Sequence, residues 1–211
     1  MKSIIYDVDG TLWDSTALIA ENWRKISSSR NYPFEHITAD ALRGEFGKLL
    51  PDIGRSLFPM LPEDEMLKLI TDCCDSDNAW LFENRQPLYE GVEEVITAVH
   101  NAGLKQIIVS NCTGGYIETL IAIHHLEDRI DGHICATDTG FGKCDNIRIA
   151  CERYQLDDPV YVGDTLGDYT ATKGAGLPFV FASYGFGCVP SPDYIIQKPE
   201  DILTLAGIRN N

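Results

Sequence analysis

Two aspartates separated by one residue, Asp7 and Asp9, end a short apolar run near the start of the chain. Residues 2–8 are rich in β-branched and aromatic side chains and predict a buried strand, which Gly10 and Thr11 interrupt. Alternate residues of a strand face the same side, so both carboxylates could point into one cleft. Like charges this close repel unless a cation lies between them, and Mg²⁺ prefers such oxygen ligands. The pair therefore suggests a magnesium site.

Polar residues also follow three other predicted strands. They are Ser110 and Asn111 after strand 106–109, Lys143 beyond strand 132–136, and Asp164 and Asp168 after strand 159–162. Taken alone, each short motif is more typical of a turn or a helix cap than of a functional site. In open α/β sheets, however, ligands bind beyond the carboxyl ends of the strands. Four strand ends that all carry such residues therefore indicate one shared site.

Together these residues are suited to phosphoryl transfer. Asp7, which the strand would hold rigidly, is the better candidate nucleophile and would form an aspartyl-phosphate. Asp9 would protonate the leaving alcohol and then deprotonate the water that cleaves the intermediate. Mg²⁺ would be bound by Asp7, the backbone carbonyl of Asp9 and Asp164.

The remaining polar residues are predicted to bind the phosphoryl group. Ser110, Asn111 and neighbouring amides would donate hydrogen bonds to its oxygens, and Lys143 would offset their charge. A cation at a helix N-terminus opposes the macrodipole, and a phosphate there would remove this conflict. Asp168 would orient Lys143 or a metal-bound water without contacting the substrate.

The elements that must position these residues follow a clear order along the chain. After the first strand, helices are predicted over residues 16–27, 38–43 and 62–81, with no strand among them. From residue 87 onward, strands and helices alternate, with a final edge strand over 193–196 and a closing helix over 199–206. This alternation predicts an α/β fold with a Rossmann-like, three-layer parallel sheet core. Residues 1–16 and 86–211 would form the core, and residues 17–85 an inserted all-helical cap.

Composition limits the classes of partner. The chain has 211 residues and a formal net charge of −15, so it should repel nucleic acid and anionic membranes. It has no apolar run of the roughly 20 residues that span a bilayer, and no signal-peptide pattern. Its seven cysteines form no CxxC pair, which favours reduced thiols in a cytoplasmic protein. The expected partner is a small phosphorylated metabolite, and the oligomeric state is open.

The arrangement resembles the haloacid dehalogenase superfamily along the whole chain. Asp7-Val-Asp-Gly-Thr11 is similar to its first motif, Ser110 to its second, Lys143 to its third, and Gly163-Asp164 with Asp168 to its fourth. The helical insertion resembles the small cap of the phosphoglycolate-phosphatase-like branch, which closes over the site and contacts the leaving group. The resemblance implies a Mg²⁺-dependent phosphomonoesterase that acts through an aspartyl-phosphate.

Other activities within this superfamily remain open. Dehalogenases lack the second aspartate, so Asp9 argues against that branch. The β-phosphoglucomutase branch has a cap histidine where Ile19 stands here, which weakens the phosphosugar mutase alternative. Phosphonoacetaldehyde hydrolases use a buried cap lysine, and Lys25 or Lys48 keeps that alternative open. A catalytically silent binding protein with the same fold is a further alternative.

The sequence is least informative about the substrate. Arg43 and Lys48 lie in a stretch that resembles the cap loop of the phosphatase branch, and either could bind a carboxylate or second phosphate of the substrate. An ordinary solvated charge explains each of them equally well. Residues 184–187, Tyr-Gly-Phe-Gly, are expected to flank the cleft.

Overall fold

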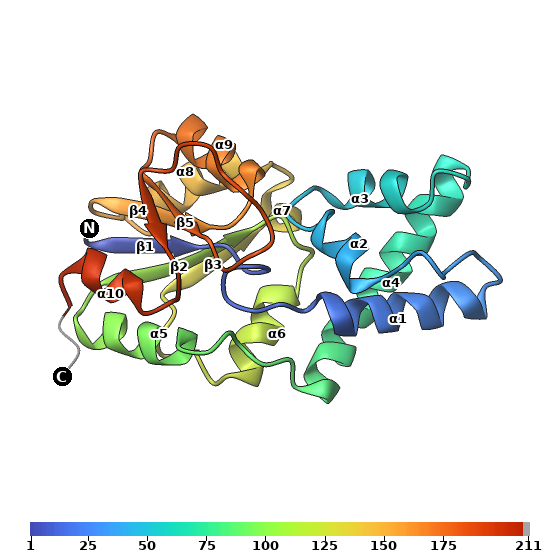
Figure 1. The fold of residues 1–211 in the computed structure, drawn as a ribbon, viewed down its shortest axis with the longest axis horizontal. Helices are drawn as coiled ribbons and strands as arrows, with labels where there is room; N and C mark the ends of the chain where they lie inside the picture. Colours follow the sequence, from blue (N-terminus) through green and yellow to red (C-terminus); the bar gives the residue numbers. More distant parts are fainter. Residues whose placement is uncertain (209–211) are drawn as a thin grey trace.

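A computed structural model describes residues 1–208 and shows a six-stranded, entirely parallel sheet in the order β3-β2-β1-β4-β5-β6 (Figure 1). The strands are β1 (Ser3–Tyr6), β2 (Lys105–Ser110), β3 (Gly132–Cys135), β4 (Pro159–Gly163), β5 (Phe179–Ala182) and β6 (Tyr194–Ile196). From the central strand β1 the chain first adds β2 and β3 on one side, and then β4, β5 and β6 on the other side. The predicted parallel sheet and its edge strand are confirmed.

Helices cover both faces of the sheet (Figure 1). One face carries α5 (Val92–Asn101), α6 (Tyr116–Ile123) and α10 (Asp201–Ala206), and the other carries α8 (Lys143–Arg153) and α9 (Leu166–Ala175). Side chains of β1 alternate between two apolar cores, with Ile4 and Tyr6 in the first and Ile5 in the second. The three-layer architecture is therefore as the sequence predicts.

Four helices precede α5 and pack together beside the sheet (Figure 1). They are α1 (Thr16–Ser29), α2 (Ala39–Arg43), α3 (Leu50–Leu57) and α4 (Glu63–Asn84). Thr38 caps α2 through a hydrogen bond from the Ala41 amide, as the sequence suggests. We call residues 17–85 the helical insertion.

The two chain segments that join the helical insertion to the sheet lie against each other. Trp13, before the insertion, pairs with Leu88, after it, in an isolated antiparallel bridge. The side-chain amide of Gln86 donates a hydrogen bond to the backbone carbonyl of Asp14 at 3.0 Å. Trp13 is fully buried, so this junction is part of the apolar core.

Several element boundaries differ from the predictions. Strand β1 ends at Tyr6 and not at Val8. Helix α8 begins at Lys143, as the predicted place of this cation at a helix N-terminus requires. Helix α3 was not predicted, because Pro51 and Gly54 are typical helix breakers. Proline is tolerated in the first turn, and a Cβ at Gly54 would lie 2.2 Å from Sδ of Met66.

The short helix α7 (Ala136–Thr139) was also not predicted. It depends on a capping box with Cys135, a residue that rarely occupies this position. Within residues 1–208, none of the helices combines the length and the apolar character that a membrane crossing requires.

Candidate active site

Asp7 follows β1 directly and lies next to a buried cation. Its backbone N–H donates to the carbonyl of Val162 at 2.9 Å, which extends the β1–β4 pairing by one residue. Its Oδ1 lies 2.9 Å from Nζ of Lys143, the first residue of α8. Lys143 also pairs with Asp168 of α9, and all three side chains are almost completely buried. The predicted roles of Lys143 beside Asp7, and of Asp168 behind Lys143, are compatible with this geometry.

The charges of Asp7, Lys143 and Asp168 shift the pKa values of Asp7 and Lys143. Burial raises the pKa of Asp7 to about 6, together with the charge of Asp168, while Lys143 opposes the shift. Burial also lowers the pKa of Lys143, but the charges of Asp168 and Asp7 outweigh it and hold this pKa well above its ordinary value. Lys143 is therefore cationic and Asp7 is largely ionised at neutral pH.

Asp164 follows β4 and lies close to Asp7. Its Oδ2 accepts a hydrogen bond from the Phe186 amide at 2.7 Å, which places the segment 184–187 at the site as predicted. Burial raises the pKa of Asp164 to about 8, with further contributions from Asp168 and Asp7. Thr165, and not Asp164, caps α9, so the alternative interpretation of Asp164 as a helix cap is wrong.

Gly10 leaves room for the Asp164 carboxylate. A Cβ at Gly10 would lie 2.1 Å from Oδ2 of Asp164, and the φ of Gly10 is +82°, which side chains disfavour. We expect Gly10→Ala to displace Asp164 and to lower turnover at this site by at least about tenfold, since a displacement of 1 Å can cost this much or more. Steady-state kinetics will measure this.

Gly103 provides the matched control for this substitution. Its φ is +74°, but no atom lies within 4 Å of the place of its Cβ. Gly103→Ala should therefore lower the free energy of unfolding by about 1 kcal/mol and leave turnover unchanged. Equal turnover in both variants would show that the space beside Asp164 is not needed.

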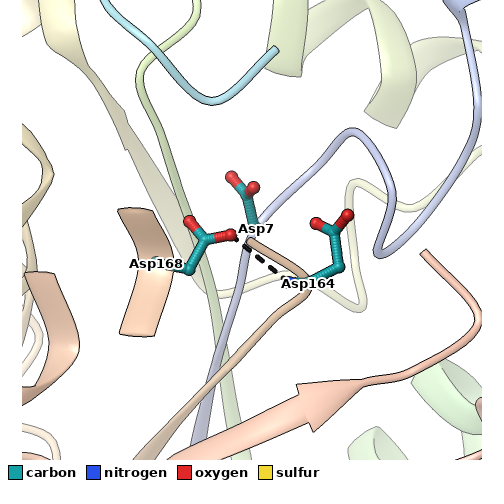
Figure 2. Close-up of side chains that lie close together, drawn as sticks. All are labelled: Asp7, Asp164 and Asp168. Carbon is teal, nitrogen blue, oxygen red and sulfur yellow. Dashed lines mark hydrogen bonds between the residues drawn. The ribbon is translucent and has the colours of Figure 1, made fainter. Parts of the chain in front are cut away.

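The carboxylates fit a hard cation. Each of Asp7, Asp164 and Asp168 offers an oxygen within 4.8 Å of the others (Figure 2). Oδ1 of Asp7 is buried and accepts no well-angled hydrogen bond from any residue between 1 and 208. Both oxygens of Asp168 are already engaged, one by Lys143 and the other by Thr165. Asp164 accepts a hydrogen bond from Phe186 at Oδ2 and only a long one, 3.5 Å, from Thr11 at Oδ1, so Asp7 and Asp164 have more capacity left for a metal ion than Asp168.

The carboxylate of Asp9 does not belong to the group that Asp7, Asp164 and Asp168 form. Its Oδ1 accepts hydrogen bonds from Oγ of Ser15 at 2.6 Å and from the hydroxyl of Tyr116 at 2.9 Å. Strand β1 ends before Asp7, so strand alternation does not determine how Asp7 and Asp9 face each other. That the two carboxylates share one cleft stays a prediction. A metal contact of Asp9 through its backbone carbonyl stays a prediction.

The pKa of Asp9 suits proton transfer at neutral pH. Burial raises this pKa to about 7, while the hydrogen bonds from Ser15 and Tyr116 oppose the shift and the charge of Asp7 adds to it. A carboxyl group with a pKa near the working pH can both donate and accept a proton efficiently.

A cleft of about 540 Å³, its open mouth included, lies between the sheet and the helical insertion. From the sheet side it is lined by Asp9, Ser110 and Asn111, and from the insertion by Trp23, Phe46 and Asp77. Asn111 also joins the two sides, because its Nδ2 donates to the carbonyl of Gly47 at 2.8 Å. The structure thus places Ser110 and Asn111 beside Asp9.

The basic residues proposed for substrate binding are already paired. Arg43 donates to Asp14 at 2.8 Å and does not line the cleft. Lys48 lines the cleft, but its Nζ lies 2.7 Å from Oε2 of Glu45.

Lys25 and Lys48 differ from the lysine that a Schiff base requires. Lys25 is half exposed and pairs with Glu21, and Lys48 is also half exposed. A buried lysine with a lowered pKa is needed for this chemistry. Neither residue has that burial.

Sequence reasoning missed Tyr116, Ser15 and Asp77. The sequence at the start of a helix does not show which distant residues its side chains contact. The hydrogen bond from the Tyr116 hydroxyl to Asp9 could therefore not be predicted. Asp77 had a detectable signal, because it stands on the apolar face of the predicted helix, seven residues after Ile70. An acidic residue at such a position warrants a functional explanation.

Comparison with known proteins agrees with this fold and site. The family described as haloacid dehalogenase-like hydrolase matches residues 4–182, and the chain belongs to this family. The predicted resemblance is therefore confirmed, and the protein is a hydrolase of this class.

Individual relatives cover nearly the whole chain. It is 23% identical to the pyrophosphatase PpaX of Anoxybacillus flavithermus, over 99% of this chain and 98% of the relative. It is 28% identical to a phosphoglycolate phosphatase of Rhodobacter capsulatus, over 89% and 87%. A solved structure from Bacteroides fragilis, described as a haloacid dehalogenase-like hydrolase, superposes with a TM-score of 0.84 at 20% identity, over 95% and 99%.

Proposed function

We propose that the protein is a Mg²⁺-dependent phosphatase that hydrolyses a small phosphorylated metabolite through an aspartyl-phosphate on Asp7. The observation that carries this proposal is the buried Asp7 carboxylate, held between Lys143 and Asp164 at the carboxyl end of the central strand. The phosphatases and pyrophosphatase among its relatives support it.

In the first step, an oxygen of Asp7 attacks phosphorus and the bond from phosphorus to the ester oxygen breaks. Asp9 gives its proton to the departing alcohol. In the second step, Asp9 takes a proton from water, whose oxygen attacks phosphorus, and the bond from phosphorus to Asp7 breaks. Inorganic phosphate leaves and Asp9 is protonated again.

Other residues stabilise the charge that develops on the phosphoryl oxygens. Lys143 offsets this charge, and Asp168 holds the Lys143 ammonium in place. Ser110 and Asn111 donate hydrogen bonds to the phosphoryl group. Asp7, Asp164 and the backbone carbonyl of Asp9 would hold Mg²⁺, which would supply positive charge to offset that of the nucleophile and the substrate. Gly10 provides the space that this arrangement requires.

We assign residues 17–85 as a cap and residues 1–16 with 86–211 as the catalytic core. A cap over the cleft would exclude water during phosphoryl transfer. Free thiols at all seven cysteines support a reducing, cytoplasmic compartment. Ile19 lines the cleft where the mutase branch has a histidine, and an aliphatic side chain transfers no proton.

Metal removal tests this function. We expect a chelator such as EDTA to lower hydrolysis of p-nitrophenyl phosphate by at least about a hundredfold, since the metal offsets several kcal/mol of developing charge. Added Mg²⁺ should restore the activity. Release of p-nitrophenol is the measurement, and circular dichroism checks that the chelator leaves the fold intact.

A calcium salt at the same concentration serves as the control, because Ca²⁺ prefers more ligands and longer bonds than Mg²⁺. Calcium should restore far less activity than magnesium. Full activity in the presence of EDTA would contradict the proposed function.

A further inference from the structure

Asp77 is a buried carboxylate that the proposed reaction does not use. It lies on α4 of the helical insertion, is 4% exposed and lines the cleft. Its oxygens accept hydrogen bonds from Nδ2 of Asn22 at 2.7 Å and from Nε1 of Trp23 at 2.9 Å. Both donors are neutral, and no cation of residues 1–208 forms an ion pair with Asp77. Burial raises the pKa of Asp77 to about 7, and a cationic occupant of the cleft would favour its ionised form.

The cleft contains further acceptors besides Asp77. Asp9 lines the same cleft from the sheet side. Oδ1 of Asn111 is buried and has no hydrogen-bond donor among residues 1–208. An occupant with several N–H donors would satisfy these atoms, and an occupant with acceptors only would not.

The charge of the cleft disfavours an anionic leaving group. Of the residues that line it, Lys48 is the one basic residue within the described chain, and Glu45 already neutralises it. A carboxylate or a second phosphate would therefore lie near Asp9 and Asp77 without an unpaired cation. Three aromatic rings, those of Trp23, Phe46 and Tyr116, also line the cleft, together with aliphatic side chains such as Ile19 and Ile53. Aromatic faces attract ammonium groups, and this attraction adds to that of a carboxylate.

We propose that the substrate is the phosphate ester of a small amino alcohol, and that Asp77 binds the ammonium group of its leaving alcohol. This inference rests on the proposed phosphatase function and adds the chemical class of the ester. With the phosphoryl group at Asp7 and Lys143, the amine extends from Asp9 toward α4. Asp77 acts as a specificity residue, while Arg43 and Lys48 pair within the protein.

Three esters of similar size test the inference: phosphoethanolamine, 2-hydroxyethyl phosphate and phosphoglycolate. They place an ammonium, a hydroxyl and a carboxylate at the same end of the leaving group. We expect kcat/KM to fall by at least about tenfold from amine to hydroxyl and again from hydroxyl to carboxylate, as buried charge pairs discriminate this strongly. Release of inorganic phosphate is measured for each ester.

Asp77→Asn keeps the shape of the side chain and removes its charge. In this variant the ratio of kcat/KM between the amine and hydroxyl esters should fall to about one, because the charged partner is lost. Asp75→Asn is the matched control, since Asp75 lies on the same helix, is exposed and does not line the cleft. The ratio of kcat/KM between the amine and hydroxyl esters should be the same for Asp75→Asn as for the unmodified protein.

The outcomes separate this inference from the proposed function. Hydrolysis of p-nitrophenyl phosphate without preference for the amine, or with preference for the carboxylate, overturns the inference alone. A preference for the amine that survives Asp77→Asn overturns the role of Asp77. If Mg²⁺ supports no hydrolysis of p-nitrophenyl phosphate either, the function and the inference fail together.

Discussion

Asp7→Asn should reduce hydrolysis of p-nitrophenyl phosphate by at least about a thousandfold, because an amide cannot act as the nucleophile. The substitution keeps the size of the side chain and removes a charge that burial disfavours, as the pKa of about 6 for Asp7 indicates. Lys143 retains Asp168 as its partner. The free energy of unfolding should therefore change by less than about 2 kcal/mol.

Two measurements check this expectation together, namely release of p-nitrophenol and unfolding by urea. Asp157→Asn makes the same chemical change on the surface, where Asp157 pairs with exposed Lys2. It should leave both turnover and stability nearly unchanged. Turnover of Asp7→Asn within tenfold of the unmodified protein would exclude Asp7 as the nucleophile, whereas a lost unfolding transition would show only that the variant is unfolded.

Lys143→Met should affect both activity and stability. The buried ammonium pairs with Asp7 and Asp168, and its removal leaves two buried carboxylates without a cation. Breaking a buried pair in this way costs about 3–5 kcal/mol. Loss of the positive charge beside the phosphoryl group should lower turnover by at least about a hundredfold.

Two variants separate these effects. Lys143→Met with Asp168→Asn removes one of the unpaired carboxylates, so it should recover part of the stability and none of the activity. Lys173→Met breaks an exposed pair with Asp193 and should cost less than about 1 kcal/mol. If Lys143→Met unfolds at the same urea concentration as the unmodified protein, the buried charges do not support one another as described.

The sequence predicted the sheet and most of the site because both depend on local patterns. Apolar runs defined the strands, and the rule that ligands bind at strand ends selected Asp7, Ser110, Lys143 and Asp164. The geometry of Asp7 beside Lys143 agrees with that selection. Helix α3 escaped prediction, because its proline and glycine are ordinary breakers that only tertiary packing makes acceptable.

The residues that contact Asp9 or line the cleft beside it were not predictable in the same way. Tyr116 and Ser15 reach Asp9 only because α6 and the start of α1 meet above β1, and no spacing in the sequence encodes that meeting. Asp77 is an acidic residue on an apolar helix face, a signal that sequence reasoning overlooked, and only the fold shows that this face lines the cleft.

The bridged junction between Trp13 and Leu88 lies close in sequence to a residue that sets the pKa of Asp9. The bridge and the hydrogen bond from Gln86 to Asp14 hold the two chain crossings against each other. Ser15 is the next residue after Asp14, and its hydroxyl donates to Asp9. That hydrogen bond lowers the pKa of Asp9, so a displacement of the junction that stretched it would raise this pKa. The packing of the two crossings and the proton affinity of Asp9 are thereby linked through the hydroxyl group of Ser15.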